Sequence, residues 1–307
     1  MACNLFYKKK PADGGIMRTD WNGKPYYSLD YYLKETFGTK VYKLALDGGM
    51  TCPNRDGSLD NRGCIFCSAG GSGDFAVHGE SIPIQLERGK ALFGDKKIGS
   101  HYIAYFQAYT NTYESIDKLK RMYEEALSVE DVIGIVIGTR PDCVSDELLD
   151  YLGHLNTQTF ITIEYGIETA NNNTLKLINR GHDFECVKRI VSKTAEKGII
   201  TGGHIILGLP GEDSEEIIRQ APLISALPIN ILKMHQLQVI HNTKLAQMYK
   251  ERPFHLFSPD EYIELIGRYI KLLRKDIVIE RFTSQSPKDM LVGPQWGMKN
   301  HEFTDKL

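Results

Sequence analysis

The stretch VIGIVIGTRPDCVSDELLDYLGHLNTQTFITIEY, residues 132–165, decides the fold that we predict for this chain. It opens on an apolar run, 132–137, and closes on another, 160–165, and both runs have the length of a strand. Between them, Ser145 can cap a helix over residues 145–155. A strand, a helix and a second apolar strand make a βαβ unit, which builds a parallel sheet with a right-handed crossover.

The same alternation continues along the chain in both directions. We expect further strands at the apolar runs 41–46, 102–106, 199–207 and 229–239. We expect the remaining helices at 82–97, 115–127, 184–197 and 214–226. This gives about six β/α units, and their strands are apolar on both faces, as buried parallel strands are. Six such units fit an open doubly wound sheet or a partial barrel.

The two ends of the chain depart from this pattern. Residues 3–24 are polar, and we expect them to form an extended arm before a short helix over 28–38. Near the C-terminus we expect an amphipathic helix over 259–275 and a strand over 277–282. The predicted organisation is an N-terminal arm and helix (1–38), a barrel-like domain (39–242) and a C-terminal extension (243–307).

Composition excludes several classes of protein. The chain has 307 residues, of which 42% are hydrophobic and 25% charged, so it is neither a disordered chain nor a disulfide-stapled miniprotein. Its 37 Lys+Arg against 39 Asp+Glu argue against a strongly basic nucleic-acid binder, although local basic patches stay open. The N-terminus lacks the apolar core of a signal peptide, and we expect a cytoplasmic protein with reduced thiols and no membrane association.

Three of the six cysteines cluster in TCPNRDGSLDNRGCIFC, residues 51–67, after the first predicted strand. Eleven residues separate Cys52 from Cys64, and two separate Cys64 from Cys67. This spacing leaves two kinds of metal site open. Structural zinc usually takes four ligands, of which His78 could be the fourth. Three thiolates on a [4Fe-4S] cluster would instead leave one iron open to an outside ligand, which indicates a catalytic cluster.

The cysteine loop, with the aromatic Phe66 just before the last cysteine, resembles that of radical S-adenosylmethionine (SAM) enzymes. The usual spacing in that family is C-x3-C-x2-C, and the longer first interval here resembles the Elongator-subunit-3-like branch. Three phrases in order resemble a bacterial subgroup of that branch: LDGGMTCPNRDG (46–57), YFQAYTNTY (105–113) and GTRPDC (138–143). The resemblance extends over about residues 26–286.

The resemblance implies an α/β fold with a partial (β/α)6 TIM-like barrel and a radical reaction. Cys52, Cys64 and Cys67 would bind three irons of a [4Fe-4S] cluster, and the fourth iron would bind the amino and carboxylate groups of SAM. An electron from a donor such as flavodoxin or ferredoxin would cleave SAM to methionine and a 5′-deoxyadenosyl radical. That radical would take a hydrogen atom from the substrate.

The same resemblance implies a transfer RNA (tRNA) substrate, because Elongator-like relatives modify the wobble uridine. We expect remodelling of a 5-substituted uridine, for example carboxymethylaminomethyluridine to aminomethyluridine. Two alternatives stay open: a radical SAM oxidoreductase that acts on a small metabolite, and a non-catalytic, zinc-containing RNA-binding protein. A basic group in the tail, around Arg274 and Arg281, could face RNA or be a solvated helix face.

Six residues are candidates for SAM binding: Phe66, Gln107, Thr110, Glu168, Arg180 and His204. Gln107 and Thr110 lie where the family commonly has a Gly-Gly-Glu-type segment, which this chain lacks, so an ordinary polar loop is the other interpretation. The resemblance implies a ribose contact for Glu168, or else a salt bridge to an arginine. It implies a methionine-carboxylate contact for Arg180, or else a solvated helix end. His204 could contact ribose or be a core histidine.

Overall fold

The computed structural model describes residues 21, 23–71, 79–94 and 101–307, so most of the expected arm over 3–24 lies outside the described residues. The strands are β1 (Val41–Leu46), β2 (His101–Phe106), β3 (Val132–Thr139), β4 (Phe160–Glu168), β5 (Ile200–Leu207), β6 (Ile231–Gln236), β7 (Val239–Ile240), β8 (Val278–Arg281) and β9 (Leu291–Gly293). The helices are α1 (Leu29–Phe37), α2 (Ile82–Ala91), α3 (Ile116–Leu127), α4 (Asp146–Leu155), α5 (Asn172–Leu177), α6 (Phe184–Glu196), α7 (Ser214–Ser225), α8 (Lys244–Glu251), α9 (Pro259–Ile270) and α10 (Asn300–Thr304).

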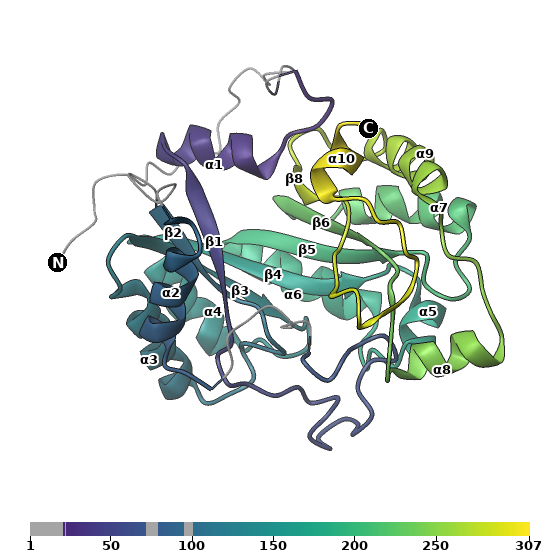
Figure 1. Cartoon of the computed structure of the whole chain (residues 1–307). Coiled ribbons are helices and arrows are strands. Elements are labelled where there is room, and N and C mark those ends of the chain that lie inside the picture. The colour runs from purple at the N-terminus through teal and green to yellow at the C-terminus, as the bar shows by residue number, and fades with distance from the viewer. Residues whose placement is uncertain (1–20, 22, 72–78, 95–100) are drawn as a thin grey trace.

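Seven parallel strands form one curved sheet in the order β1-β2-β3-β4-β5-β6-β8 (Figure 1). A doubly wound sheet reverses its strand order at a switch point, whereas this order follows the chain throughout. The fold is therefore an α/β partial barrel, as predicted. β8 adds a seventh strand beside β6 from the segment after residue 243, where we placed a domain boundary that stays a prediction.

The predicted strands and helices between residues 28 and 236 are confirmed, but the helix expected over 82–97 ends at Ala91 and the strand expected over 229–239 ends at Gln236. Residues 95–97 of that helix lie outside the described residues. Ser28 caps α1 by accepting a hydrogen bond from the Tyr31 N–H, and Gly38 ends the helix in the left-handed conformation. The short helices α5, α8 and α10 and the small antiparallel pair β7–β9 were not predicted. Each is too short to carry a clear hydrophobic period in the sequence.

Helix α1 closes the barrel at the amino ends of the strands. Its Leu33 and Phe37 pack against Val41, Ile103 and Phe160, which lie near the starts of β1, β2 and β4. The rings of Phe37 and Phe160 meet edge to face with their centroids 5.3 Å apart. Figure 1 shows α1 lying across this end of the sheet. Helix α1 thus closes the barrel at the amino ends of the strands, and a cavity forms at their carboxyl ends.

Candidate active site

The three clustered cysteines line one cavity at the carboxyl ends of the strands, with a volume of about 240 Å³. Cys52, Cys64 and Cys67 lie in the loop between β1 and α2, which folds into two turns. The carbonyl of Cys52 accepts hydrogen bonds from the N–H groups of Arg55 and Asp56, at 2.8 and 3.1 Å, and that of Cys64 accepts from Cys67 at 3.0 Å. These turns bring three thiols separated by fifteen positions to one wall of the cavity.

Hydrogen-bond donors surround the buried thiol of Cys64. Asn54 Nδ2 lies 3.5 Å from the sulfur and Arg180 Nη1 lies 3.6 Å from it. Burial, reinforced by neighbouring Cys64, raises the pKa of the Cys67 thiol to about 11, although Arg55 opposes this. The Cys67 thiol loses its proton when a metal centre takes up the charge, because the thiolate is the metal-binding form.

The three thiols that line the cavity are the donor type that holds an iron–sulfur cluster. Within the described ranges, no three His, Cys, Asp or Glu side chains converge on one point as the ligands of a single ion must. A [4Fe-4S] cluster takes each thiolate on a different iron, so its ligands are spread over the cluster. His78, the expected fourth ligand of a zinc site, lies outside the described residues.

Arg180 and Glu168 form a buried ion pair beside Cys64. Arg180 Nη2 lies 3.3 Å from Glu168 Oε1 and donates to the Gly166 carbonyl at 2.6 Å. The interpretation of Arg180 as a solvated helix end is wrong, since the residue is 7% exposed and lines the cavity. For Glu168, the pair is the salt bridge to an arginine that we weighed against ribose binding. Its role toward SAM stays a prediction.

Period-two alternation along β4 is confirmed, because Glu164, Gly166 and Glu168 all line the cavity. Gly166 is required by its neighbours: a Cβ there would fall within 3.0 Å of both Arg180 Nη2 and Glu168 Oε1. Glu168 itself has φ +66°, a left-handed conformation uncommon outside glycine. β4 therefore ends in a bend that turns Glu168 toward Arg180.

The segment after β2 brings Gln107 and Thr110 to the cavity, together with Tyr109. Tyr109 has φ +60°, and its hydroxyl donates to the Ala69 carbonyl at 2.6 Å. Strained non-glycine residues concentrate at functional sites. The Thr110 N–H donates to the Thr51 carbonyl at 3.3 Å, which ties this segment to the cysteine loop. The structure thus gathers these residues around the site, while their contacts with SAM stay predictions.

Phe66 and His204 also line the cavity. Phe66 lies in the cysteine loop, and His204 lies in β5. His204 Nε2 lies 2.8 Å from Glu164 Oε2, so this histidine has a partner in the barrel interior. Burial and the nearby Lys233 ammonium lower the pKa of His204, although Glu164 opposes them. His204 is therefore partly buried and hydrogen-bonded, as a core histidine would be. It also lines the cavity, as a ribose contact would require.

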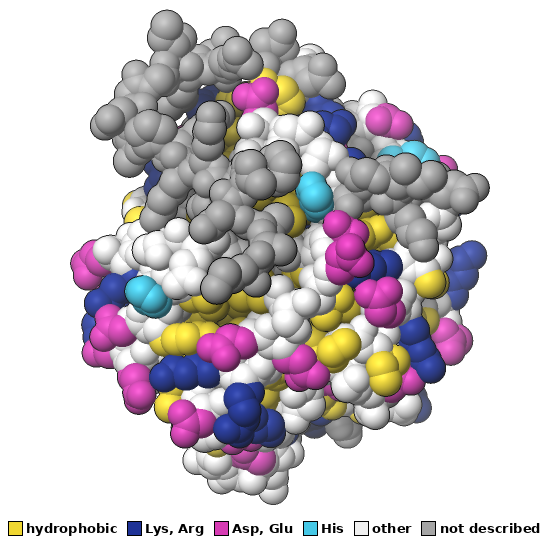
Figure 2. Space-filling view, turned by 90° about the vertical axis from the view of Figure 1, so that its left-hand side faces the viewer, with side chains coloured by type: hydrophobic (Ala, Val, Ile, Leu, Met, Phe, Trp, Pro, Cys, Tyr) yellow, Lys and Arg dark blue, Asp and Glu magenta, His cyan; other side chains and the backbone are white. Residues whose placement is uncertain are grey.

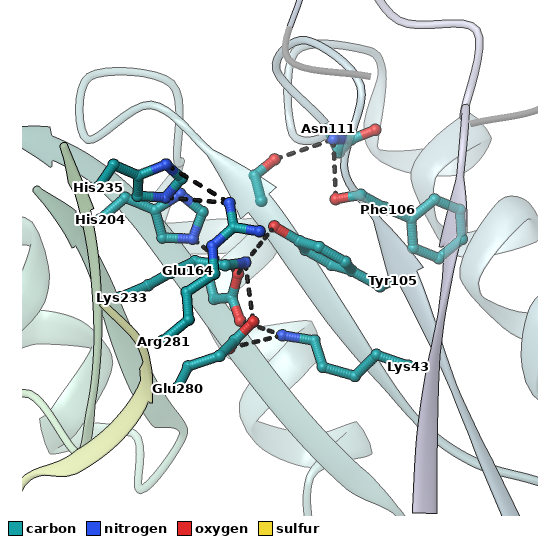
Figure 3. Close-up of polar contacts among 11 residues, drawn as sticks. Lys43, Tyr105, Phe106, Asn111, Glu164, His204, Lys233, His235, Glu280 and Arg281 are labelled. Atoms are coloured by element: carbon teal, nitrogen blue, oxygen red, sulfur yellow. Dashed lines mark hydrogen bonds and ion pairs between the residues drawn. The ribbon is translucent and has the colours of Figure 1, made fainter. Parts of the chain in front are cut away.

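A layer of paired charges crosses the barrel interior (Figure 3). Lys43 Nζ lies 2.5 Å from Glu164 Oε1 and 2.8 Å from Glu280 Oε2. Lys233 Nζ lies 3.4 Å from Glu164 and 2.9 Å from Glu280, and 3.1 Å from the Tyr105 hydroxyl. Burial alone would raise the pKa of Glu164, but Lys233 and Lys43 hold it well below its usual value. We call these five residues the charged layer.

Sequence reasoning missed most of the charged layer. Lys43 and Lys233 each interrupt an apolar strand, VYKLAL and ILKMHQ, and this was the available signal. A buried lysine needs a counter-charge, and two carboxylates on other strands supply it. The predicted basic group of the tail is not one patch: Arg274 donates to the carbonyls of Ser225 and Leu227, whereas Arg281 faces the cavity.

Comparison with known proteins identifies the family. The Radical SAM superfamily model matches residues 61–220, which include Cys64 and Cys67, and the Radical_SAM C-terminal domain model matches residues 229–307. The chain is 39% identical over 280 residues to the uncharacterised protein YtqA of Bacillus subtilis, covering 91% of this chain and 87% of YtqA. This chain belongs to the radical SAM superfamily.

More distant similarity confirms the Elongator-like resemblance. A tRNA uridine(34) acetyltransferase of Methanocaldococcus infernus is 24% identical over 184 residues, which are 57% of this chain and 34% of that protein. The solved structure of the archaeal Elp3 from the same organism superposes with a TM-score of 0.63 at 19% identity, covering 83% of this chain and 59% of that one. The chain thus spans about three fifths of the Elp3 structure, and this likeness shows the fold.

Family membership makes the chain an enzyme that cleaves SAM, and it implies a [4Fe-4S] cluster and SAM as cofactors. The three cavity cysteines are the described thiols that fit such a cluster. No helix in the described ranges is long and apolar enough to cross a membrane.

Proposed function

We propose that this radical SAM enzyme modifies a 5-substituted wobble uridine of tRNA, and that it converts carboxymethylaminomethyluridine to aminomethyluridine. In this conversion the bond between the side-chain nitrogen and the carboxymethyl carbon breaks, water supplies the oxygen, and the two-carbon fragment leaves as glyoxylate, with SAM as the two-electron oxidant that ends as methionine and 5′-deoxyadenosine. The observation that supports it best is the single cavity in which the cysteine loop, the Arg180–Glu168 pair and the charged layer meet. A nucleobase that undergoes chemistry must leave its stack and enter a pocket of this kind. The tRNA uridine(34) acetyltransferase among the relatives supports an RNA substrate.

In this proposal the cysteines hold the cluster, which when bound supplies the electron that cleaves SAM. Cys52, Cys64 and Cys67 bind three irons, and the Arg180 guanidinium, next to Cys64, offsets their negative charge. Arg180 also holds the SAM carboxylate, and Glu168 accepts hydrogen bonds from the ribose hydroxyls. A protein donor such as flavodoxin or ferredoxin supplies the electron to the cluster.

Phe66, Gln107, Thr110 and His204 complete the proposed SAM site. Phe66 covers the cofactor beside the cluster loop, and Gln107 and Thr110 contact the methionine amino group from the end of β2. His204 contacts the ribose from β5, held in place by its hydrogen bond to Glu164. Together these side chains surround the reacting atoms and exclude water from them.

The net charge of the chain provides little electrostatic attraction for tRNA. On the face seen in Figure 2, acidic and basic side chains are interspersed over the described residues. The formal net charge is −2. We therefore expect binding to depend on the extruded base as much as on phosphate contacts, and so to weaken with salt less steeply than in a strongly basic RNA-binding protein.

Two experiments test the proposal. Iron and acid-labile sulfide are measured on anaerobically purified protein, with Cys52→Ala as the test variant and Cys186→Ala, outside the cavity lining, as the control. We expect Cys52→Ala to lose the cluster absorbance and SAM cleavage, and Cys186→Ala to keep both. Zinc without sulfide in the wild type would refute the assigned cluster.

Nucleoside mass spectrometry of tRNA from a strain lacking this gene tests the substrate. We expect carboxymethylaminomethyluridine to accumulate and aminomethyluridine derivatives to disappear, and both to return on complementation with the wild type but not with Cys52→Ala. An unchanged wobble-uridine profile would refute the tRNA substrate and leave the small-metabolite oxidoreductase.

A further inference from the structure

Arg281 adds a positive charge that the charged layer does not neutralise. The two lysines of the layer are matched by its two carboxylates, since both Glu164 and Glu280 contact both lysines. Arg281 follows Glu280 at the end of β8 and lines the cavity. Among the described residues it has no carboxylate partner. With Arg281 there are three cations against two anions, which leaves one positive charge in excess.

The guanidinium of Arg281 is oriented by an imidazole rather than by an acid. Its Nη2 lies 3.2 Å from His235 Nε2, and Figure 3 shows the guanidinium beside His235 and His204. Its Nε is buried and has no hydrogen-bond partner in the described part of the chain. A buried donor without an acceptor is costly, so this geometry favours a ligand that supplies one.

The groups around Arg281 do not supply a negative charge of their own. Burial, together with the adjacent Arg281 cation, lowers the pKa of His235 well below its usual value, so this imidazole is neutral. Burial, with Glu164 next, raises the pKa of Tyr105 well above its usual value, so its hydroxyl is neutral as well. A cation in such surroundings is stabilised by an anion that binds from the cavity.

We propose that Arg281, oriented by His235, binds a carboxylate carried by the substrate base. The inference rests on the proposed function, because it assigns the anionic end of that substrate to one wall of the cavity. A guanidinium binds a carboxylate through two parallel hydrogen bonds, and the free Nε–H with one Nη–H provides such a pair. Ser284 and Ser286, which follow β8 in the chain, also line the cavity.

Two other anions share this chemistry, and the position of Arg281 disfavours both. RNA phosphates lie on the outside of the nucleic acid, whereas the Nε of Arg281 is fully buried inside the barrel. The SAM carboxylate has its own proposed partner in Arg180, which lies next to Cys64. A group attached to the extruded base reaches deepest into the cavity, where Arg281 meets the charged layer.

The first arm of the test uses two probes that differ by one charge. The nucleoside 5-carboxymethylaminomethyluridine and its methyl ester are titrated into anaerobically reconstituted enzyme with SAM by isothermal calorimetry. We expect the wild type to bind the acid about tenfold to a hundredfold more tightly than the ester, as for a charge-assisted hydrogen bond. Arg281→Gln should bind both with the affinity of the ester, and Arg281→Lys should keep part of the preference.

The second arm does not depend on the identity of the base. Acetate is the probe, with chloride at equal ionic strength as its reference, and the readout is the melting temperature. Acetate should protect the wild type and the control Arg268→Gln, an exposed arginine outside this cavity, more than Arg281→Gln. SAM affinity of Arg281→Gln should equal that of the wild type.

The outcomes separate the subsite from the proposed function. Equal acetate protection of the wild type and Arg281→Gln, or an equal loss of acid and ester binding in the variant, would overturn the subsite. Weaker SAM binding by Arg281→Gln would assign the anion to SAM instead. Preserved acetate protection together with an unchanged wobble-uridine profile would refute the tRNA substrate and keep the carboxylate subsite.

Discussion

Replacing Gly166 by alanine should damage the proposed SAM site without touching a proposed ligand. The added Cβ would lie 2.6 Å from Glu168 Oε1 and closer still to Arg180 Nη2, and real Cβ atoms essentially never approach so closely. The side chains of Arg180 and Glu168 are only 8% and 11% exposed, so neither can swing into solvent to make room. The ion pair must therefore shift, and its contacts with the Gly166 carbonyl and Cys64 must lengthen.

The size of the effect follows from these contacts. Overpacking of a buried site costs about 1–3 kcal/mol of folding stability. Displacing one charge-assisted hydrogen bond to a ligand costs about 1.5–3 kcal/mol of binding free energy, which is roughly a tenfold to a hundredfold loss of SAM affinity. Since the strand before Gly166 is buried and well paired, we expect the variant to fold and the loss to fall mainly on SAM.

The assay is equilibrium binding of SAM to anaerobically reconstituted Gly166→Ala, with melting temperature as the measure of folding. Gly267→Ala is the matched control, because a Cβ at this position in α9 meets nothing within 4 Å. That control should gain about 0.5–1 kcal/mol from helix propensity and bind SAM as the wild type does. Wild-type SAM affinity in Gly166→Ala would refute the placement of SAM beside Arg180 and Glu168.

Two further predictions concern the charged layer and its neighbour His235. Glu164→Gln leaves two buried lysines with one carboxylate, so its free energy of unfolding, measured in denaturant, should fall by about 3–5 kcal/mol. The control Glu251→Gln changes an exposed residue and should lose less than about 0.5 kcal/mol. Similar values for the two variants would contradict the pairing. His235 is neutral in the fold but takes up a proton near pH 6.5 when unfolded, so stability conferred at higher pH is lost as the pH falls. Between pH 6.5 and 5.5 the wild type should lose about 1 kcal/mol more than His235→Gln, and parallel pH profiles would show that the pKa of His235 is the same in the folded and unfolded states.

The sheet could be predicted from the sequence because its strands carry their own signal. A parallel strand covered on both faces is an unbroken apolar run, as in VIGIVIGT of β3, and each run is separated from the next by a helical period. The cysteine loop could be predicted as a site because its three thiols lie within one segment. Arg180 and Glu168 could be predicted only as candidates, because the sequence around each residue does not indicate that the two side chains form an ion pair.

The charged layer could not be predicted, because its partners are far apart in the chain. Lys43 and Glu280 are separated by 237 positions, and the pairing depends on β8 lying next to β6. Nothing in the local sequence around Glu280 indicates this neighbour. Likewise, Tyr109 and Glu168 adopt left-handed conformations that their residue types disfavour, so only the surrounding structure imposes them.

A single strand shows how the fold orders the site. Along β4, Phe160 meets the ring of Phe37 from α1, Glu164 joins the charged layer, and the Gly166 carbonyl accepts a hydrogen bond from Arg180 beside Cys64. Inward positions, which recur every second residue of the strand, thus run from the apolar contact with α1 through the charged layer to the thiols. Because α1 closes the amino end of the barrel, the proposed substrate would enter at the level of the cysteines with its substituent toward the charged layer. The proposed substrate, an extruded base with an acidic substituent, matches that order, since its carboxylate would reach Arg281 beside the charged layer while the carbon atoms that link it to the base would remain nearer to SAM.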